Sequence, residues 1–216
     1  MAGINTALDQ LLTNPKDFLA NNALIIYGSN KGKSGENKFV MQATNDTQWK
    51  SGAGGGMRSV PFYVMYKDGT YNGKGTGQPS TPFDAYYISM REYNEATGAW
   101  EDTNDTHFTL PARGDIDIMV TSKLNGCTFG IGSTADGTRL VSHLRPPTQL
   151  GPAPSRLTLD AGTRSGFEGG RLDASVMSST DQNGTVIGRR TGSKWKFYAQ
   201  RYQISASFID SVQTYG

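Results

Sequence analysis

The sequence is poor in cysteine and histidine: its 216 residues include one cysteine, Cys127, and two histidines, His107 and His143. A single cysteine cannot form an internal disulfide, which excludes a disulfide-stapled domain and suits a reducing cytosol. Metal sites built from Cys and His need several ligands at short spacings, and these three residues lie too far apart to show one. We therefore expect no bound metal.

Long apolar runs and strong net charge are also missing. No stretch of about 18 apolar residues is present, so we expect no transmembrane helix. Residues 1–22 lack the basic start and the unbroken apolar stretch of a signal peptide. The formal net charge of +2 is too small to indicate nucleic-acid or membrane binding. We therefore expect a cytoplasmic protein that binds neither nucleic acid nor a membrane.

Glycine, by contrast, is abundant at 27 residues, and Ser, Thr and Asn recur between short apolar runs. This composition is typical of many strands joined by tight turns. A chain of this length can bury one sizeable core, and no repeat indicates a second. We predict a single domain over residues 1–216 of the α/β class, with a β-sandwich-like core of mixed, mainly antiparallel sheets flanked by a few helices.

Local patterns predict the individual elements. An apolar face predicts a helix over residues 4–13 that ends at Asn14-Pro15, followed by a short helix at 16–21. Residues 23–28 and 38–43 are expected to form a hairpin, and residues 60–75 a strand, a turn and a weaker return strand. Residues 156–180 are expected to form a long surface loop with one short helix. Further strands are predicted by β-branched and aromatic content at 84–94, 115–124, 138–144, 184–190 and 194–209.

The stretch TSKLNGC, residues 121–127, places the only cysteine beside a glycine near the end of an expected strand. A cysteine nucleophile acts as the thiolate and needs a nearby imidazole to take its proton. His143 lies sixteen residues downstream, on a half-buried strand expected to neighbour Cys127, whereas His107 lies in an acidic, Thr-rich loop expected at the surface. Thr121 is placed to fix the tautomer of His143 with its hydroxyl or carbonyl. From spacing alone, however, Cys127 as a small buried core residue is the favoured alternative.

The pattern T-x-x-L-x-G-C, followed by a β-hairpin and a histidine on an apolar strand, resembles the cysteine-dependent protein glutamine deamidases. This group includes the Burkholderia lethal factor, the catalytic domain of the cytotoxic necrotizing factors and the bacterial chemoreceptor deamidase. Total length and closing strands are most similar to the lethal factor, although the segment before the cysteine is longer than that likeness implies. Asn125 stands where the family has a serine, and the matching residues are Thr121, Leu124, Gly126, Cys127 and His143.

The resemblance implies a side-chain amidase that acts on a glutamine of a folded protein and needs no cofactor. Cys127 would attack the carboxamide carbon, and backbone N–H groups of the turn at Asn125, Gly126 and Cys127 would hold the oxyanion. His143 would protonate the departing ammonia and then activate the water that releases glutamate.

The resemblance also implies a toxin or effector, made in the bacterial cytoplasm and delivered to a host cytosol, where it acts as a monomer on a host protein. A translation-initiation DEAD-box helicase and a Rho-family GTPase are the targets implied by the two toxin branches. Two alternative functions remain open. One is a cysteine protease or acyltransferase with the same Cys/His pair, and the other is a non-catalytic β-rich binding domain.

Overall fold

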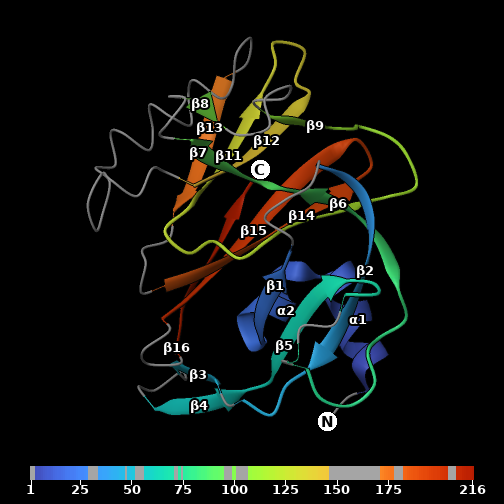
Figure 1. Ribbon diagram of the computed structural model, residues 1–216, viewed down its shortest axis with the longest axis vertical. Helices are drawn as coiled ribbons and strands as arrows, with labels where there is room; N and C mark the ends of the chain where they lie inside the picture. Colours follow the sequence, from blue (N-terminus) through green and yellow to red (C-terminus); the bar gives the residue numbers. More distant parts are fainter. Residues whose placement is uncertain are drawn as a thin grey trace.

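The computed structural model describes residues 3–28, 34–46, 48–51, 56–70, 73, 75–94, 99–100, 107–145, 171–177, 182–203 and 208–216 (Figure 1). In these ranges the chain forms two helices and sixteen strands. The helices are α1 (Ile4–Thr13) and α2 (Pro15–Asn21), as the apolar face and the Asn14-Pro15 pair predict. Asn14 caps α2 by accepting the Asp17 N–H at 3.3 Å. Neither helix is long and apolar enough to cross a bilayer, a statement that covers only the described ranges.

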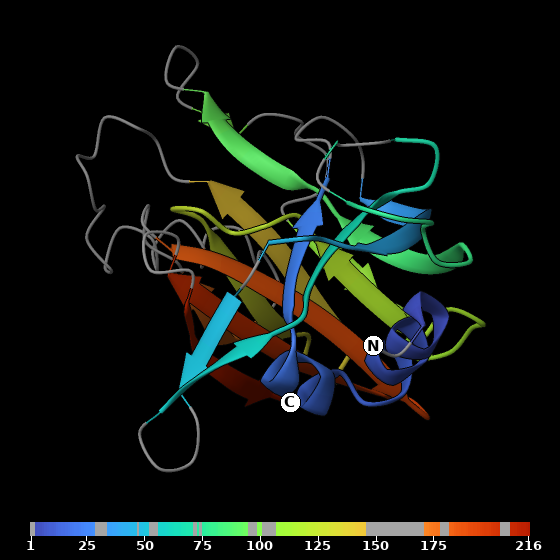
Figure 2. The same ribbon diagram turned by 90° about the horizontal axis from the view of Figure 1, so that it is seen from below.

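The large sheet has ten strands in the order β1-β5-β2-β6-β10-β14-β15-β16-β3-β4. It curls, because β4 at one end is separated from β5 near the other end by Pro61 alone, and Figure 2 shows its strands wrapping around α1 and α2. Its strands are β1 (Ala23–Tyr27), β2 (Gly35–Ala43), β3 (Gln48–Ser51), β4 (Met57–Val60), β5 (Phe62–Lys67), β6 (Phe83–Ile88), β10 (Ile118–Thr121), β14 (Gln182–Thr191), β15 (Lys194–Gln203) and β16 (Phe208–Tyr215).

The expected hairpin between residues 23–28 and 38–43 is wrong. β5 lies between β1 and β2, and it pairs with β1 in parallel and with β2 antiparallel. The sequence ALIIY is apolar on both faces, which is typical of an inner parallel strand, and four of its five residues are buried. Most of the weak return strand expected after β5 lies outside the described residues, and Thr76, just beyond it, makes an isolated bridge to Ala43.

The small sheet lies above the large one in Figure 1, with the order β13-β11-β12-β7-β8 and with β9 also paired to β12. The predicted surface loop at 156–180 needs correction at 171–177, which form an edge strand, whereas 156–170 and 178–180 lie outside the described residues. The strands of this sheet are β7 (Met90–Asn94), β8 (Ala99–Trp100), β9 (Phe108–Leu110), β11 (Thr128–Ser133), β12 (Arg139–Arg145) and β13 (Arg171–Met177).

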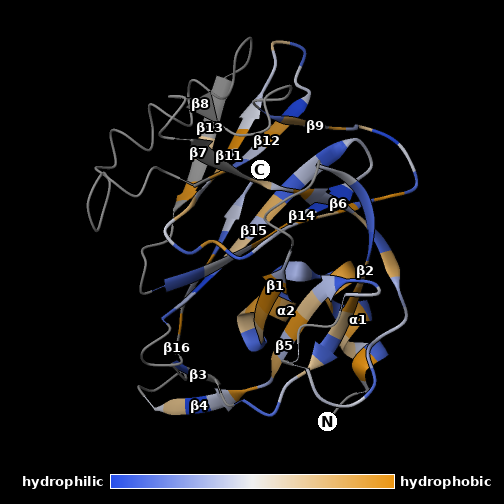
Figure 3. Ribbon diagram, in the orientation of Figure 1, coloured by the Kyte–Doolittle hydropathy of each residue, from blue (hydrophilic) through white to orange (hydrophobic). Residues whose placement is uncertain are grey.

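Strand β6 shows how the large sheet separates two apolar cores. Ala85 and Tyr87 pack in the core beneath the helices, whereas Tyr86 and Ile88 pack in the core shared with the small sheet. This alternation follows from the two-residue period of a strand. Figure 3 shows the apolar residues concentrated on the helices, β1 and β5. The predicted β-rich core of mixed, mainly antiparallel sheets flanked by a few helices is confirmed.

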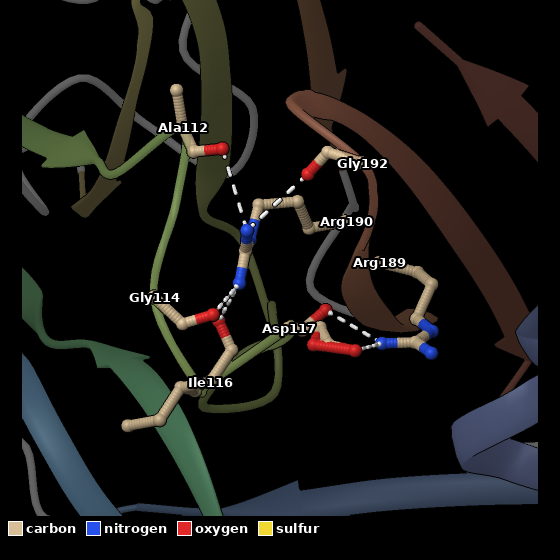
Figure 4. A network of polar contacts seen from close by, with 7 residues as sticks. All are labelled: Ala112, Gly114, Ile116, Asp117, Arg189, Arg190 and Gly192. Atoms are coloured by element: carbon tan, nitrogen blue, oxygen red, sulfur yellow. Dashed lines mark hydrogen bonds and ion pairs between the residues drawn. The ribbon is translucent and has the colours of Figure 1, made fainter.

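A buried arginine fixes the segment that leads into β10 (Figure 4). The Arg190 guanidinium donates hydrogen bonds to the backbone carbonyls of Ala112, Gly114, Ile116 and Gly192. Its neighbour Arg189 forms an ion pair with Asp117. Because residues 112–117 run directly into β10, these contacts set the position at which Thr121 ends that strand.

Candidate active site

The chain changes sheets at Ser89, and this change places two strands at the candidate site. The predicted strand at 84–94 is two strands in the structure: β6 ends at Ile88 in the large sheet, and β7 begins at Met90 in the small sheet. Ile88 pairs with Thr121 of β10, and Met90 pairs with His143 of β12. Strands of both sheets therefore meet at Ser89, with Ile88 in the large sheet and Met90 in the small sheet.

The loop from Ser122 to Cys127 joins β10 to β11 and is anchored by its backbone. The Lys123 N–H donates to the Ile26 carbonyl at 2.8 Å. Leu124 and Gly184 exchange two backbone hydrogen bonds of 2.8 and 2.7 Å. A Cβ atom at Gly184 would lie 3.1 Å from the Leu124 Cβ, so glycine there permits this close approach. Leu124 of the motif is thus an anchor for the loop and is fully buried.

Asn125 and Gly126 form the turn that carries the chain into β11. The Asn125 side-chain amide lies 3.3 Å from the Gln182 carbonyl and 3.5 Å from the Asn183 Oδ1. Gly126 has a φ of 68°, in the left-handed region that glycine adopts without strain. The glycine of the motif is therefore explained by backbone geometry, and Asn125 supports the turn through a longer side chain than serine would offer.

Cys127 is buried, with the residue 3% exposed, and its thiol contacts Met90. Its Sγ is 3.6 Å from the Met90 Sδ and 3.6 Å from the Asn125 carbonyl oxygen. Both Cys127 and Phe129 belong to the core between the sheets, and Phe129 pairs with His143. Cys127 directly precedes β11, two residues before the Phe129 that pairs with His143, so it lies at the end of a strand that neighbours β12, as expected.

Thr121 and His143 are in direct contact. The Thr121 Oγ1 lies 2.7 Å from the His143 Nδ1 and 2.8 Å from the Ile88 carbonyl oxygen, to which it donates. With the Thr121 proton directed at the Ile88 carbonyl, the His143 Nδ1–H is assigned as the donor in the shorter contact, and the Ser122 Oγ lies 3.5 Å from the same nitrogen. This network assigns the tautomer with a proton on Nδ1, which leaves Nε2 as an acceptor.

Burial determines the charge of His143. The side chain is fully buried, and burial lowers its pKa from 6.5 to about 3. Its Nε2 is a buried atom without a hydrogen-bond partner in the structure. At neutral pH the imidazole is therefore uncharged, and the same burial makes its Nε2 a weaker base than a histidine in water.

A pocket of 190 Å³ opens beside the cysteine, between the end of β1 and the start of β7. Gly28 borders it, and a Cβ atom there would lie 1.9 Å from the Tyr87 hydroxyl oxygen, so a larger residue would have to displace the Tyr87 side chain. Of Thr121, Cys127 and His143, only Cys127 lines the pocket, with Thr121 and His143 behind it. The lining residues are Ile26, Tyr27, Gly28, Met90, Ser122, Lys123, Asn125 and Cys127.

Three residues near the site differ from what the sequence predicts. His107, expected at the surface, is only partly exposed and precedes β9, whose Phe108 pairs with Val141 of β12. Met90 and Lys123 were not recognised as site residues. The apolar pattern of 84–94 shows a strand, but it carries no signal for the change of sheet that brings Met90 to Cys127.

No protein-family model matches this sequence, and no curated protein shows significant similarity to it. In the described part of the chain, no group of three His, Cys, Asp or Glu side chains could hold a metal ion. The likeness to the glutamine deamidases therefore rests on the motif residues.

Proposed function

We propose that the protein is a glutamine deamidase, which converts a glutamine side chain of a target protein to glutamate. The observation that carries the proposal is the contact between Thr121 and His143. It leaves the Nε2 of a neutral imidazole without a hydrogen-bond partner on β12, opposite Phe129, which follows Cys127 by two residues. A thiol and a correctly oriented imidazole are the two groups that thioester chemistry requires.

The first half of the reaction forms a thioester. The His143 Nε2 takes the Cys127 proton, and the sulfur attacks the carboxamide carbon of the glutamine. Backbone N–H groups of the turn at Asn125, Gly126 and Cys127 stabilise the negative oxygen of the tetrahedral intermediate. The protonated His143 then gives its proton to the amide nitrogen, the C–N bond breaks, and ammonia leaves.

The second half restores the enzyme. The neutral His143 takes a proton from water, the hydroxide attacks the thioester carbon, and the C–S bond breaks. The thiolate regains its proton from the imidazole, and the product is a glutamate. If a primary amine attacks the thioester in place of water, the same site performs transglutamination.

The small pocket supports a side-chain substrate, because 190 Å³ is enough for the end of one extended side chain. We propose a protein target in a host cell, either a translation-initiation DEAD-box helicase or a Rho-family GTPase, with the protein acting as a toxin or effector. The change from glutamine to glutamate adds one negative charge at the target position.

A cysteine protease or acyltransferase would use the same Cys/His pair. Incubation of the protein with a cell lysate, with ammonia release and new peptide N-termini measured in parallel, separates these activities. The deamidase proposal predicts ammonia that depends on Cys127 without new N-termini. New N-termini without ammonia would replace the proposal with a protease.

A non-catalytic binding domain is favoured by one observation, the low exposure of Cys127, whose thiol contacts Met90. Alkylation by iodoacetamide near pH 6 tests this alternative, because Cys127 is the only cysteine of the chain. An activated nucleophile reacts faster than a model thiol at this pH. Reaction slower than the model thiol would favour the binding domain.

A further inference from the structure

We propose that Lys123 makes the pocket selective for a glutamine that has a carboxylate close to it, an inference that rests on the proposed deamidase function. Among the described residues that line the pocket, Lys123 is the single charged one. Its backbone lies four residues before the Cys127 nucleophile in the anchored loop. The charge of this side chain therefore stands at the place where a substrate must pass to reach the sulfur.

The position of the Lys123 ammonium is set by an aromatic ring. Its Nζ lies 5.5 Å from the centre of the Tyr27 ring, and Tyr27 also lines the pocket. A cation over a ring face is held by the quadrupole of the ring, but its positive charge is not neutralised. The backbone N–H of Lys123 is bonded to Ile26, which fixes the base of the side chain.

No carboxylate in the described ranges lies within ion-pair distance of Lys123. Burial, and to a smaller extent the negative charge of Asp46, raises the pKa of the Tyr27 hydroxyl. Asp46 is nevertheless not among the residues that line the pocket. Among the described lining residues, the positive charge of Lys123 thus has no acidic counterpart. A substrate carboxylate supplies that counterpart and gains affinity at a site that excludes much of the water.

The ligand chemistry is a carboxylate, and the source that fits best is an acidic side chain next to the target glutamine. The carboxamide occupies the pocket against Cys127, and a neighbouring Asp or Glu of the same chain remains at the entrance near Lys123. A C-terminal carboxylate has the same chemistry and is distinguished by the second test below.

The first test measures the charge at the pocket without any substrate protein. Cys127 is alkylated with iodoacetate and with iodoacetamide, which differ mainly in charge, and the ratio of the two rates is compared with that of an uncharged cysteine peptide. The wild-type ratio should exceed the peptide ratio by about three- to tenfold and fall in 0.5 M salt. Lys123→Met should bring the ratio close to that of the peptide, and Lys123→Glu should bring it below.

Lys194→Met is the matched control, because Lys194 is exposed and begins β15 at the far end of the hairpin from Gln182 and Asn183, which contact the loop. It should leave the ratio unchanged. A wild-type ratio equal to that of the peptide, or a ratio that Lys123→Met does not change, would overturn the inference. Failure of both reagents to alkylate Cys127 would also overturn it, because a substrate carboxylate could then not reach the sulfur through this pocket.

The second test identifies the deamidated glutamines of a cell lysate and compares wild type with Lys123→Glu. Wild-type sites should be enriched in Asp or Glu within two positions of the glutamine, and the variant should lose or reverse this enrichment. Sites confined to chain ends would assign the carboxylate to a C-terminus and overturn the side-chain source. Conversion without acidic enrichment would refute the inference and leave the deamidase intact, whereas no conversion at all would refute the deamidase itself.

Discussion

The Thr121 hydroxyl lies 2.7 Å from the Nδ1 of His143, although the two residues belong to different sheets. The same hydroxyl donates to the Ile88 carbonyl at 2.8 Å, so it is assigned as the acceptor for the imidazole N–H. This relationship fixes the tautomer of His143 and turns its basic nitrogen away from Thr121. It is the geometric basis of the proposed mechanism.

Thr121→Val removes the hydroxyl and keeps the shape of the side chain. The Ile88 carbonyl and the Nδ1–H lose a partner in a buried site, so we expect a destabilisation of about 1–3 kcal/mol in urea unfolding. Loss of tautomer control should reduce kcat/KM for deamidation on the order of 100-fold. Thr121→Ser retains the hydroxyl and should keep most of the activity. Equal activity of the Val and Ser variants would mean that the hydrogen bond does not orient His143.

His143→Ala should reduce activity by a factor of about 10² to 10⁴, because it removes the general acid and base. His107→Ala should remain close to wild type in ammonia release, although His107 is nearer to β12 than its sequence context predicts. Circular dichroism of both variants checks that they fold. The reverse pattern of activities would identify His107 as the base.

The depressed pKa of His143 predicts a loss of stability in acid. The folded protein binds the proton only near pH 3, whereas an unfolded histidine binds it near 6.5, so protonation favours the unfolded state as the pH falls between these values. At pH 5 the histidine should cost about 2 kcal/mol relative to pH 8. His143→Gln cannot titrate, so its unfolding free energy should fall less between pH 8 and pH 5. Identical pH profiles of the two proteins would show that His143 is not buried in its neutral form.

Gly126→Ala places a Cβ in the left-handed region and should cost about 1–2 kcal/mol of stability. We expect an additional loss of activity, because the strained turn displaces Cys127. Gly137→Ala is the control: Gly137 has a φ of 85°, and a Cβ added there would meet no atom within 4 Å, so the variant bears similar strain away from the site. Equal activity of the two variants would show that the turn geometry at Gly126 does not position the nucleophile.

Local signals in the sequence were sufficient for much of the fold. The apolar face and the Asn14-Pro15 boundary predict both helices, and the strand content of 184–190 and 194–209 predicts β14 and β15, although β15 ends at Gln203 and β16 begins at Phe208. Pairing between distant strands was harder, as the insertion of β5 between β1 and β2 shows. Sequence patterns indicate which faces of a strand are buried, but they do not indicate which other strand pairs with its edge.

The residues of the candidate site were likewise predictable only in part from the sequence. Thr121, Cys127 and His143 were singled out by residue type and spacing, and the expected contact between Thr121 and His143 is present. Met90 and Lys123 were missed, since one depends on the change of sheet at Ser89 and the other on a pocket formed with β1. Such contacts arise only when segments far apart in the chain are packed together.

Cys127→Ser tests the central claim most directly, because the exchange is nearly isosteric and removes the chain's only thiol. Eukaryotic cell lysate is treated with wild type or with the variant, and mass spectrometry searches for glutamines that have become about one dalton heavier. The account predicts a specific set of such glutamines with wild type and none above background with Cys127→Ser. The same modified glutamines in both samples would contradict a mechanism in which the Cys127 sulfur attacks the carboxamide.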